Sequence, residues 1–302
     1  MKHLISMRDL SADKILQLLA LAESLEKNPA QIDLARKVMA AVFYEASTRT
    51  RMSFESAMKR LGGEVIGMVG TSGTSVEKGE TLADTTRVMA RYSDIIVIRH
   101  PMEGAARYVS EQVDIPVVNA GDGANQHPTQ SLLDLFTIKK SQGSLENLKL
   151  ALVGDLKYGR TVHSLAYALA PFNPEFYFIS PKSLGMPAHI LNDLTKMNVK
   201  FKEKTTIGKI VNEVDILYVT RIQRERFPDQ EEYEKVKNAY IVTADLLTKA
   251  KTNMKVMHPL PRVNEITTDV DSTKYAYYFD QAENGVYMRQ AILATLLGEV
   301  KS

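Results

Sequence analysis

The sequence of 302 residues contains no cysteine. The chain therefore cannot form a disulfide, use a thiolate nucleophile or build a cysteine-ligated zinc site. It also lacks an apolar run of about 20 residues, the length that a membrane-spanning helix needs, and its first residues lack the apolar core of a secretion signal. We therefore expect a cytoplasmic enzyme or binding protein without membrane contact.

Neither sign of charge is in excess. The chain has 38 Lys and Arg against 36 Asp and Glu, a net charge of +2. This balance argues against a general polyanion binder, so we expect no nucleic-acid partner, and any basic site must be local. The composition, 44% hydrophobic and 25% charged, is that of an ordinary globular protein. The length fits two α/β domains of about 150 residues each.

Short apolar runs alternate with amphipathic segments along the chain. The runs are rich in Val and Ile and do not alternate strictly with polar residues, which is typical of strands buried on both faces. Strands are predicted at 38–44, 64–69, 94–99, 115–121, 148–155, 175–180, 215–220 and 255–259. Helices are predicted after Ser11 and at 49–61, 82–92, 130–140, 161–169 and 285–300. The fold class is therefore α/β, with two doubly wound parallel sheets.

The polar segment 139–149 separates a predicted helix from a fresh strand, so it is the predicted hinge. It divides the chain into a first domain, 1–140, and a second domain, 141–284. The last helix, within 285–302, is expected to return to the first domain.

The first candidate site follows the strand at 38–44, where "STRTR" opens a helix. Unpaired N–H groups and the positive end of the helix dipole lie at such a turn. Ser47, Thr48 and Thr50 add hydroxyl donors, and Arg49 adds a guanidinium suited to phosphate oxygens. One hydroxyl suffices to cap a helix and this segment has three, so we favour an anion site over simple capping.

Other strand exits carry further candidates, because ligands of open parallel sheets bind beyond the carboxyl ends of the strands. Arg99 leaves an apolar strand, where an anion contact and a structural ion pair are both plausible. His127 and Gln130 lie at a helix start, and an imidazole there can polarise a carbonyl or move a proton. Ser75 and Lys78 lie in a polar loop that, taken alone, is better interpreted as a surface loop with a capping pattern than as a functional site.

The second half of the chain offers spaced arginines. "GDLKYGRT" (154–161) nearly matches a phosphate-binding P-loop, but Arg160 replaces the lysine and Asp155 brings negative charge, so we reject nucleotide hydrolysis. Arg160 is better suited to a carboxylate. A second strand exit, "TRIQRER", supplies Arg221, Gln223, Arg224 and Arg226. Together the two halves favour a transfer from a phosphorylated donor to an acidic acceptor, without a cofactor, a metal cluster or a nucleotide fingerprint.

With these motifs in order, the sequence resembles the aspartate/ornithine carbamoyltransferase family over essentially its whole length. The matching segments are "STRTR" (47–51), "SVEKGE" (75–80), "RHP" (99–101), "HPTQ" (127–130), "GDLKYGRTVHS" (154–164), "TRIQRER" (220–226) and "HPLPR" (258–262). Ornithine enzymes typically have a cysteine in the last motif, and "TRIQRER" would repel a cationic acceptor. The resemblance therefore implies aspartate as the acceptor and a role in pyrimidine biosynthesis.

The resemblance also implies a role for each candidate residue. The phosphate would be held by Ser47, Thr48, Arg49, Thr50 and Arg99. The carbonyl would be polarised by Thr50, Arg99 and His127, and the carbamoyl NH2 would be bound by Gln130 and the backbone carbonyls of Pro259 and Leu260. The α-carboxylate of aspartate would be bound by Arg160, and its β-carboxylate by Arg221 and Gln223.

Further expectations concern assembly and closure. Ser75 and Lys78 would enter the active site of a neighbouring subunit in a homotrimer, although the loop is one residue shorter than usual. Glu45 would pair with Arg160 or Arg226 as a closure latch, unless it is simply an exposed strand-end residue. The Leu260–Pro261 bond is expected to be cis. Arg51 has no ligand role, and we expect a structural one.

Three alternatives stay open at this stage. The acceptor could be ornithine or another amine, or the chain could be an inactive scaffold. Separate regulatory chains carrying their own zinc are a further partner that the resemblance leaves open.

Overall fold

The computed structural model describes residues 1–222 and 230–298. The chain divides into two compact units, Met1–Phe136 with Glu283–Ser302, and Thr137–Ala282. Both breaks lie a few residues before the boundaries predicted from the sequence. The last helix, α9 (Tyr278–Leu296), begins in unit 2 and supplies unit 1 with its remaining turns.

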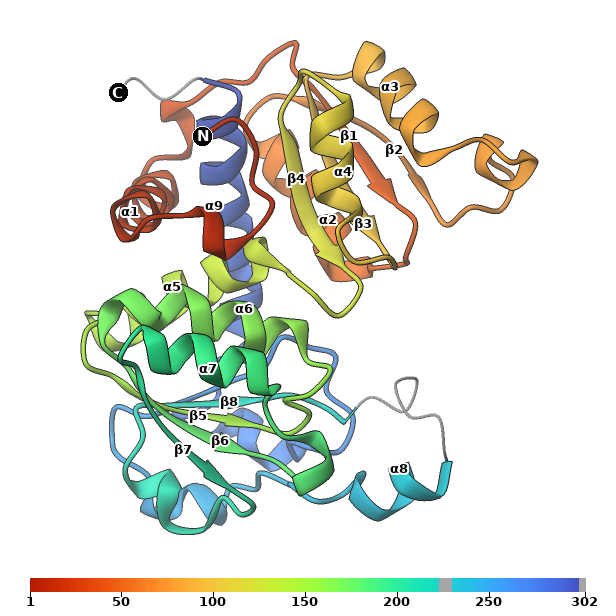
Figure 1. The fold of residues 1–302 in the computed structure, drawn as a ribbon. Coiled ribbons are helices and arrows are strands. Elements are labelled where there is room, and N and C mark those ends of the chain that lie inside the picture. The colour runs from red at the N-terminus through yellow and green to blue at the C-terminus, as the bar shows by residue number, and fades with distance from the viewer. Residues whose placement is uncertain (223–229, 299–302) are drawn as a thin grey trace. The chain divides into compact units, whose positions relative to one another are not determined.

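Unit 1 contains a parallel sheet of four strands in the order β2-β1-β3-β4 (Figure 1). The strands are β1 (Val38–Phe43), β2 (Glu64–Val69), β3 (Ile95–His100) and β4 (Val117–Asp122). Its other helices are α1 (Ala12–Lys27), α2 (Thr48–Arg60), α3 (Leu82–Tyr92), α4 (Ala105–Gln112) and the first turns of α5 (Pro128–Gln142). Ala40 and Val42 of β1 pack in one cluster with Ala106 and Val109 of α4.

Unit 2 contains a parallel sheet of five strands in the order β7-β6-β5-β8-β9. These are β5 (Lys149–Val153), β6 (Glu175–Ile179), β7 (Lys200–Lys204), β8 (Ile216–Val219) and β9 (Lys255–Met257). The helices are α6 (Arg160–Leu169), α7 (Ala188–Lys196) and α8 (Gln230–Val236). Two parallel sheets connected by helices confirm the predicted fold class.

The sequence prediction missed several elements. It omitted α4, α7, α8 and the edge strand β7, and it placed the start of the last helix at 285, where the structure has Tyr278. Strand β7 has the sequence KFKEK and is largely exposed, so it carries no apolar signal. Backbone pairing with β6 and an ion pair of 2.7 Å between Lys202 and Glu175 hold it in the sheet instead.

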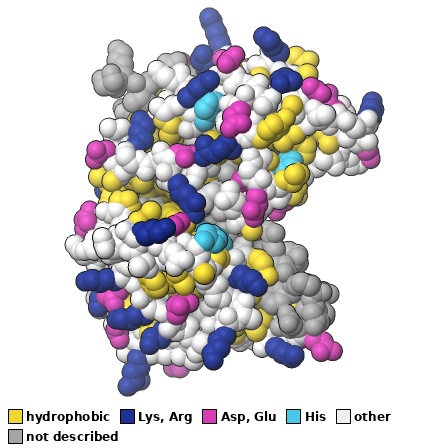
Figure 2. Space-filling view, viewed as in Figure 1, with side chains coloured by type: hydrophobic (Ala, Val, Ile, Leu, Met, Phe, Trp, Pro, Cys, Tyr) yellow, Lys and Arg dark blue, Asp and Glu magenta, His cyan; other side chains and the backbone are white. Residues whose placement is uncertain are grey.

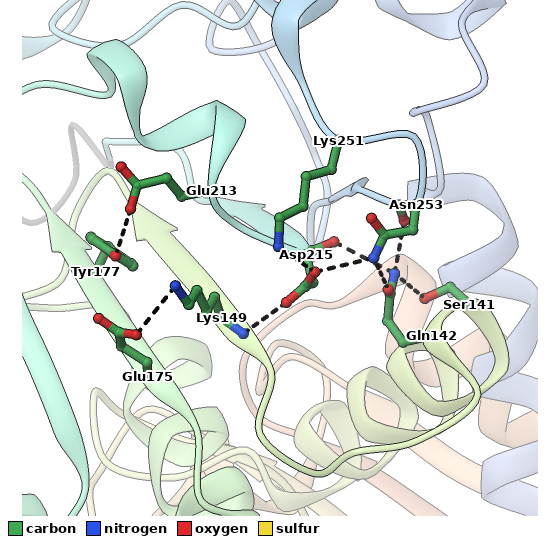
Figure 3. Close-up of polar contacts among 9 residues, drawn as sticks. All are labelled: Ser141, Gln142, Lys149, Glu175, Tyr177, Glu213, Asp215, Lys251 and Asn253. Atoms are coloured by element: carbon green, nitrogen blue, oxygen red, sulfur yellow. Dashed lines mark hydrogen bonds and ion pairs between the residues drawn. The ribbon is translucent and has the colours of Figure 1, made fainter.

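Asp215 organises the amino ends of the strands in unit 2 (Figure 3). Its carboxylate accepts hydrogen bonds from the backbone N–H of Lys149 (3.0 Å), from Lys251 Nζ (2.9 Å) and from Asn253 Nδ2 (3.1 Å). Asn253 Nδ2 also donates to Gln142 at the end of α5. Burial raises the pKa of Asp215, but these three donors outweigh burial, and the pKa lies below its usual value.

We expect Asp215→Ala to lower the free energy of unfolding by about 3 kcal/mol, because it removes hydrogen bonds to a charged acceptor and leaves their donors unpaired. Since the folded-state pKa is depressed, this contribution is present above the unfolded pKa of about 3.9 and is lost as the pH falls through the folded value. Urea unfolding at pH 7 and pH 3.5 measures both effects. Asp245→Ala is the control, since that exposed carboxylate makes no capping hydrogen bond. Equal losses in the two variants would contradict this prediction.

Charges of both signs are intermixed on the face of the molecule drawn in Figure 2. Within the described residues, no helix has both the length and the apolar character needed to cross a bilayer.

Candidate active site

The strand order of unit 1 changes direction between β1 and β3. The chain runs from β1 outward to β2, then returns to β3 on the other side of β1. Ligands of open parallel sheets bind at such a switch point, beyond the carboxyl ends of the two strands. Phe43, the last residue of β1, is directly paired with Arg99 of β3. The structure thus brings Arg99 beside the turn that leads to Ser47, as an anion site requires.

The turn from β1 into α2 carries hydroxyl groups that make no hydrogen bond to the described part of the chain. Ser47 has extended backbone angles and stands at the N-cap, yet its side chain makes no capping hydrogen bond. Within the described residues, the hydroxyls of Thr48 and Thr50 likewise have no hydrogen-bond partner. A helix start whose N–H groups and hydroxyls are both available is suited to an anion. Arg49 is exposed on the same first turn.

Arg51, for which the sequence offered only a structural role, pairs with Glu55 one turn further along α2. The distance from Arg51 Nε to the Glu55 carboxylate is 3.1 Å. Pairs of this i,i+4 type stabilise a helix by about 0.3–0.5 kcal/mol. The Arg51 side chain is therefore engaged in an ion pair on the helix surface.

Arg99 is the most buried cation at this switch point, with 12% of its side chain exposed. Its Nη2 donates to Glu45 Oε1 at 3.1 Å. Its Nε is buried and has no hydrogen-bond partner among the described residues. A buried donor without a partner costs about 1–3 kcal/mol, and an anionic ligand would remove that cost.

His127, Pro128 and Gln130 lie where β4 leads into α5. His127 is 4% exposed and its Nδ1 lies 3.4 Å from Thr129 Oγ1. Gln130 is 8% exposed, and its Nε2 donates to Asp134 Oδ1 at 2.9 Å. Pro128 is the first helical residue, where its missing N–H has no cost.

Asp122 holds the loop before His127 in place. Its carboxylate accepts hydrogen bonds from the backbone N–H groups of Gln126 and Gly104 and from the side chains of Asn119 and Asn125. The sequence analysis did not single out Asp122 or Asp134. The signal was present, since both are acidic residues within seven positions of the His127 motif.

The loop with Ser75 and Lys78 forms a short 3-10 helix, Ser75–Lys78. Glu80 accepts hydrogen bonds from Ser75 Oγ (2.6 Å) and Thr85 Oγ1 (2.7 Å), which lower the pKa of Glu80. Lys78 is exposed and makes no hydrogen bond or ion pair to the described residues. Its ammonium group is thus available to a ligand or to another chain.

Unit 2 has its own switch point, between β5 and β8. β5 leads through Gly154 to Arg160, the first residue of α6, and β8 leads through Thr220 to Arg221. Gly154 has φ +116°, and a Cβ there would lie 2.2 Å from the carbonyl oxygen of Thr220. Glycine therefore allows the two strand exits to approach closely. Gln223, Arg224 and Arg226 lie outside the described residues.

The strand next to β8 ends in the segment His258–Arg262. The Leu260–Pro261 bond is cis, which confirms that expectation. His258 Nδ1 accepts a hydrogen bond from the N–H of Leu260 at 2.7 Å, so its Nε2 carries the proton and donates to Glu265 at 2.7 Å. Burial raises the pKa of Glu265, but the interaction with His258 and the hydrogen bonds from backbone N–H groups together outweigh burial, and the pKa lies below its usual value. Both side chains are buried and fix the backbone around Pro259 and Leu260.

The fold defines a two-domain α/β protein with a switch point in each parallel sheet and arginines at the strand exits beside it. No group of three or more His, Cys, Asp or Glu residues suited to a metal ion occurs within residues 1–222 and 230–298.

Comparisons with known proteins agree with this class. Residues 2–140 match the aspartate/ornithine carbamoyltransferase carbamoyl-P binding domain, and residues 146–296 match the Asp/Orn binding domain of the same family. The chain belongs to the aspartate/ornithine carbamoyltransferase family.

Individual relatives match over nearly the full chain. The catalytic subunit of aspartate carbamoyltransferase from Thermococcus kodakarensis is 56% identical over 98% of this chain and 97% of its own length. The corresponding subunit from Bacteroides fragilis is 53% identical over 98% and 97%.

Solved structures agree as well. The catalytic subunit of M. jannaschii aspartate transcarbamoylase has a TM-score of 0.92 at 53% identity and covers 99% of this chain and 98% of its own. The Trypanosoma cruzi aspartate transcarbamoylase in complex with N-(phosphonacetyl)-L-aspartic acid has a TM-score of 0.91 at 38% identity, with 97% and 94% covered.

Proposed function

We propose that the protein transfers the carbamoyl group of carbamoyl phosphate to the α-amine of L-aspartate, giving N-carbamoyl-L-aspartate and phosphate, a step of pyrimidine biosynthesis. The observation that carries the proposal is the buried Nε of Arg99, which has no partner within the described residues. Arg99 lies beside the turn that leads into α2, where the hydroxyls of Ser47, Thr48 and Thr50 have no hydrogen-bond partner among the described residues. A phosphate ester supplies oxygens for both.

The phosphate group binds at the start of α2. Ser47, Thr48 and Thr50 donate their hydroxyls, and Arg49 and Arg99 supply positive charge, supported by the positive end of the helix. The carbonyl oxygen of the donor is bound by Thr50, Arg99 and His127. Its NH2 group is bound by Gln130 and the backbone carbonyls of Pro259 and Leu260.

Aspartate binds through residues of unit 2. Arg160 takes the α-carboxylate, and Arg221 with Gln223 takes the β-carboxylate. Guanidinium groups match carboxylates in a bidentate geometry and repel a cationic acceptor such as ornithine. The solved relatives from Trypanosoma cruzi are complexes with carbamoyl phosphate and aspartate, which supports this assignment.

The neutral α-amine of aspartate attacks the carbamoyl carbon, forming a C–N bond and a tetrahedral oxyanion. Thr50, Arg99 and His127 stabilise that oxyanion, and each preorganised donor of this kind contributes about 3–4 kcal/mol. The C–O bond to phosphate then breaks, and the leaving phosphate takes the proton of the amine. No side-chain nucleophile is needed, so the positioning of the two substrates supplies most of the remaining acceleration.

Parallel assays test the acceptor. Purified protein with carbamoyl phosphate is expected to turn over L-aspartate and not L-ornithine. N-(Phosphonacetyl)-L-aspartate is expected to stabilise the protein by about 2.7 kcal/mol at a hundred times its Kd. Turnover of ornithine alone would refute the acceptor assignment, and the absence of both turnover and stabilisation would favour an inactive scaffold.

The assembly proposed with this function is a cytoplasmic homotrimer in which Ser75 and Lys78 serve the active site of a neighbouring subunit. The exposure of Lys78 and its lack of a partner within the described residues support this arrangement. Light scattering measures the mass of the assembly. Co-expression with a zinc-containing regulatory chain would show whether such a chain associates.

Glu45 is proposed as a closure latch with Arg160 or Arg226. In the structure its carboxylate accepts a hydrogen bond from Arg99, so binding of phosphate to Arg99 competes with that pair. Glu45→Ala is expected to raise the KM for aspartate about tenfold, because the variant loses the proposed hydrogen bond between charged groups, from Arg160 or Arg226 to Glu45. The KM for carbamoyl phosphate should rise by less than about threefold. Steady-state kinetics measure both.

Glu55→Ala provides the matched control, since this glutamate pairs with Arg51 on the same segment of the chain. It is expected to leave both KM values within about twofold, as surface pairs contribute little. Equal effects of Glu45→Ala on the two substrates would refute the latch.

A further inference from the structure

The side-chain amide of Gln130 forms a hydrogen bond within the protein. Gln130 and Asp134 lie one turn apart on α5, and they are 8% and 0% exposed. Gln130 Nε2 donates to Asp134 Oδ1 at 2.9 Å. An ionised carboxylate only accepts hydrogen bonds, so Asp134 engages the NH2 end of the amide and leaves the oxygen end, Oε1, for another donor. Within the described residues, Oε1 accepts no hydrogen bond.

A buried arginine interacts electrostatically with Asp134. Arg289, on α9, is 3% exposed, donates from Nη1 to the carbonyl oxygen of Gly285 and lies 5.0 Å from the ring centre of Phe54. Burial lowers the pKa of Arg289 to about 10, and the charge of Asp134 opposes that shift. Arg289 thus remains protonated at neutral pH, and a neighbouring cation favours the ionised carboxylate.

We propose that Asp134 is a positioning residue that fixes the amide of Gln130 with its oxygen toward the substrate, and that this orientation selects a donor ending in NH2 over one ending in CH3. The inference rests on the proposed contact between Gln130 and the carbamoyl group. It adds a selection step that the contact alone does not provide, because an unanchored amide can turn either end to its ligand.

The discrimination follows from hydrogen bonding. An acetyl group has nearly the shape of a carbamoyl group but cannot donate, so on binding it leaves Oε1 desolvated and unpaired. The opposite amide orientation would set the NH2 of Gln130 against the NH2 of the substrate. Asp134 excludes that orientation, since its carboxylate would then face the amide oxygen.

Two stable phosphonates probe this selection directly. Phosphonoacetamide and 2-oxopropylphosphonate differ only in a terminal NH2 against CH3, and calorimetry without aspartate measures their binding independently of turnover. The wild-type protein is expected to bind the amide at least about tenfold more tightly.

Asp134→Asn is the decisive variant. Asparagine replaces one carboxylate oxygen by an NH2 group. When that NH2 faces Gln130, the amide of Gln130 turns over and presents its own NH2 to the substrate. We expect the preference for the amide ligand to fall about tenfold. In a Gln130→Ala background the same substitution should leave the preference unchanged, because the amide through which it acts is gone.

Ser131→Ala is the matched control, since Ser131 is buried on the same helix and its hydroxyl has no partner within the described residues. It should keep the wild-type preference. If thermal melting shows that Asp134→Asn does not fold, the same binding measurements are made on Asp134→Ser. The preference for the amide ligand is expected to fall by the same factor.

Three outcomes overturn the inference: a preference within twofold of wild type in the folded Asp134 variant, an equal change in the Gln130→Ala background, or no binding of either phosphonate to the wild-type protein. Wild-type protein that prefers the amide ligand but does not carbamoylate aspartate would refute the proposed acceptor alone.

Discussion

Replacing Arg99 by alanine is expected to lower kcat/KM by about a thousandfold, because this one side chain is proposed to contact both the phosphate and the developing oxyanion. Both kcat and the KM for carbamoyl phosphate should change, since the guanidinium acts in the ground state and in the transition state. Steady-state kinetics at saturating aspartate measure kcat and the KM for carbamoyl phosphate.

Arg51→Ala is the matched control for Arg99→Ala. It removes an arginine from the same unit, but one that is engaged with Glu55 on the surface of α2. Its kcat/KM should stay within about twofold of wild type. A comparable loss in both variants would show that general positive charge, and not the site at the β1–β3 switch point, drives the reaction.

Mixing two inactive variants is expected to restore activity. In the proposed homotrimer, Lys78→Ala and Arg99→Ala should each be nearly inactive. In trimers mixed at random from equal amounts, about a quarter of the sites obtain Arg99 from one chain and Lys78 from its neighbour. The regained activity should therefore approach about a quarter of the wild-type value. Activity after dissociation and reassembly of the mixture measures it.

A mixture of Arg99→Ala and His127→Ala should regain nothing. Both residues belong to unit 1 and are proposed to serve the site of their own chain, so no mixed trimer has an intact site. Recovery in this control, or no recovery with Lys78→Ala in trimers shown to have exchanged chains, would contradict shared active sites.

Local sequence signals were sufficient for most of the fold. The buried strands were predictable because a strand covered on both faces must be apolar along its whole length. β7 was not, because an exposed edge strand is held by backbone pairing and by Lys202 with Glu175, and neither appears as a hydrophobic pattern.

The candidate site likewise has residues that were predictable from the sequence and contacts that were not. Ser47, Thr48 and Thr50 were recognisable because they are adjacent and exceed what a cap needs. An ion pair of Arg99 was one of two predicted alternatives, but Glu45 was not predicted as its partner, and the support of Gln130 by Asp134 was not predicted. The pair of Arg99 with Glu45 joins residues 54 positions apart, and only the pairing of β1 with β3 brings them together.

The sequence by itself determined which residues can do this chemistry, because hydroxyls, guanidiniums and an imidazole at strand exits are local facts of composition and spacing. Tertiary structure decided which of them meet. The order of the strands places Arg99 beside the turn that leads from β1 to α2, and its buried Nε has no partner within the described residues. The physical reason is that strand order and desolvation arise from contacts between distant segments, and those contacts have no local signature in the sequence.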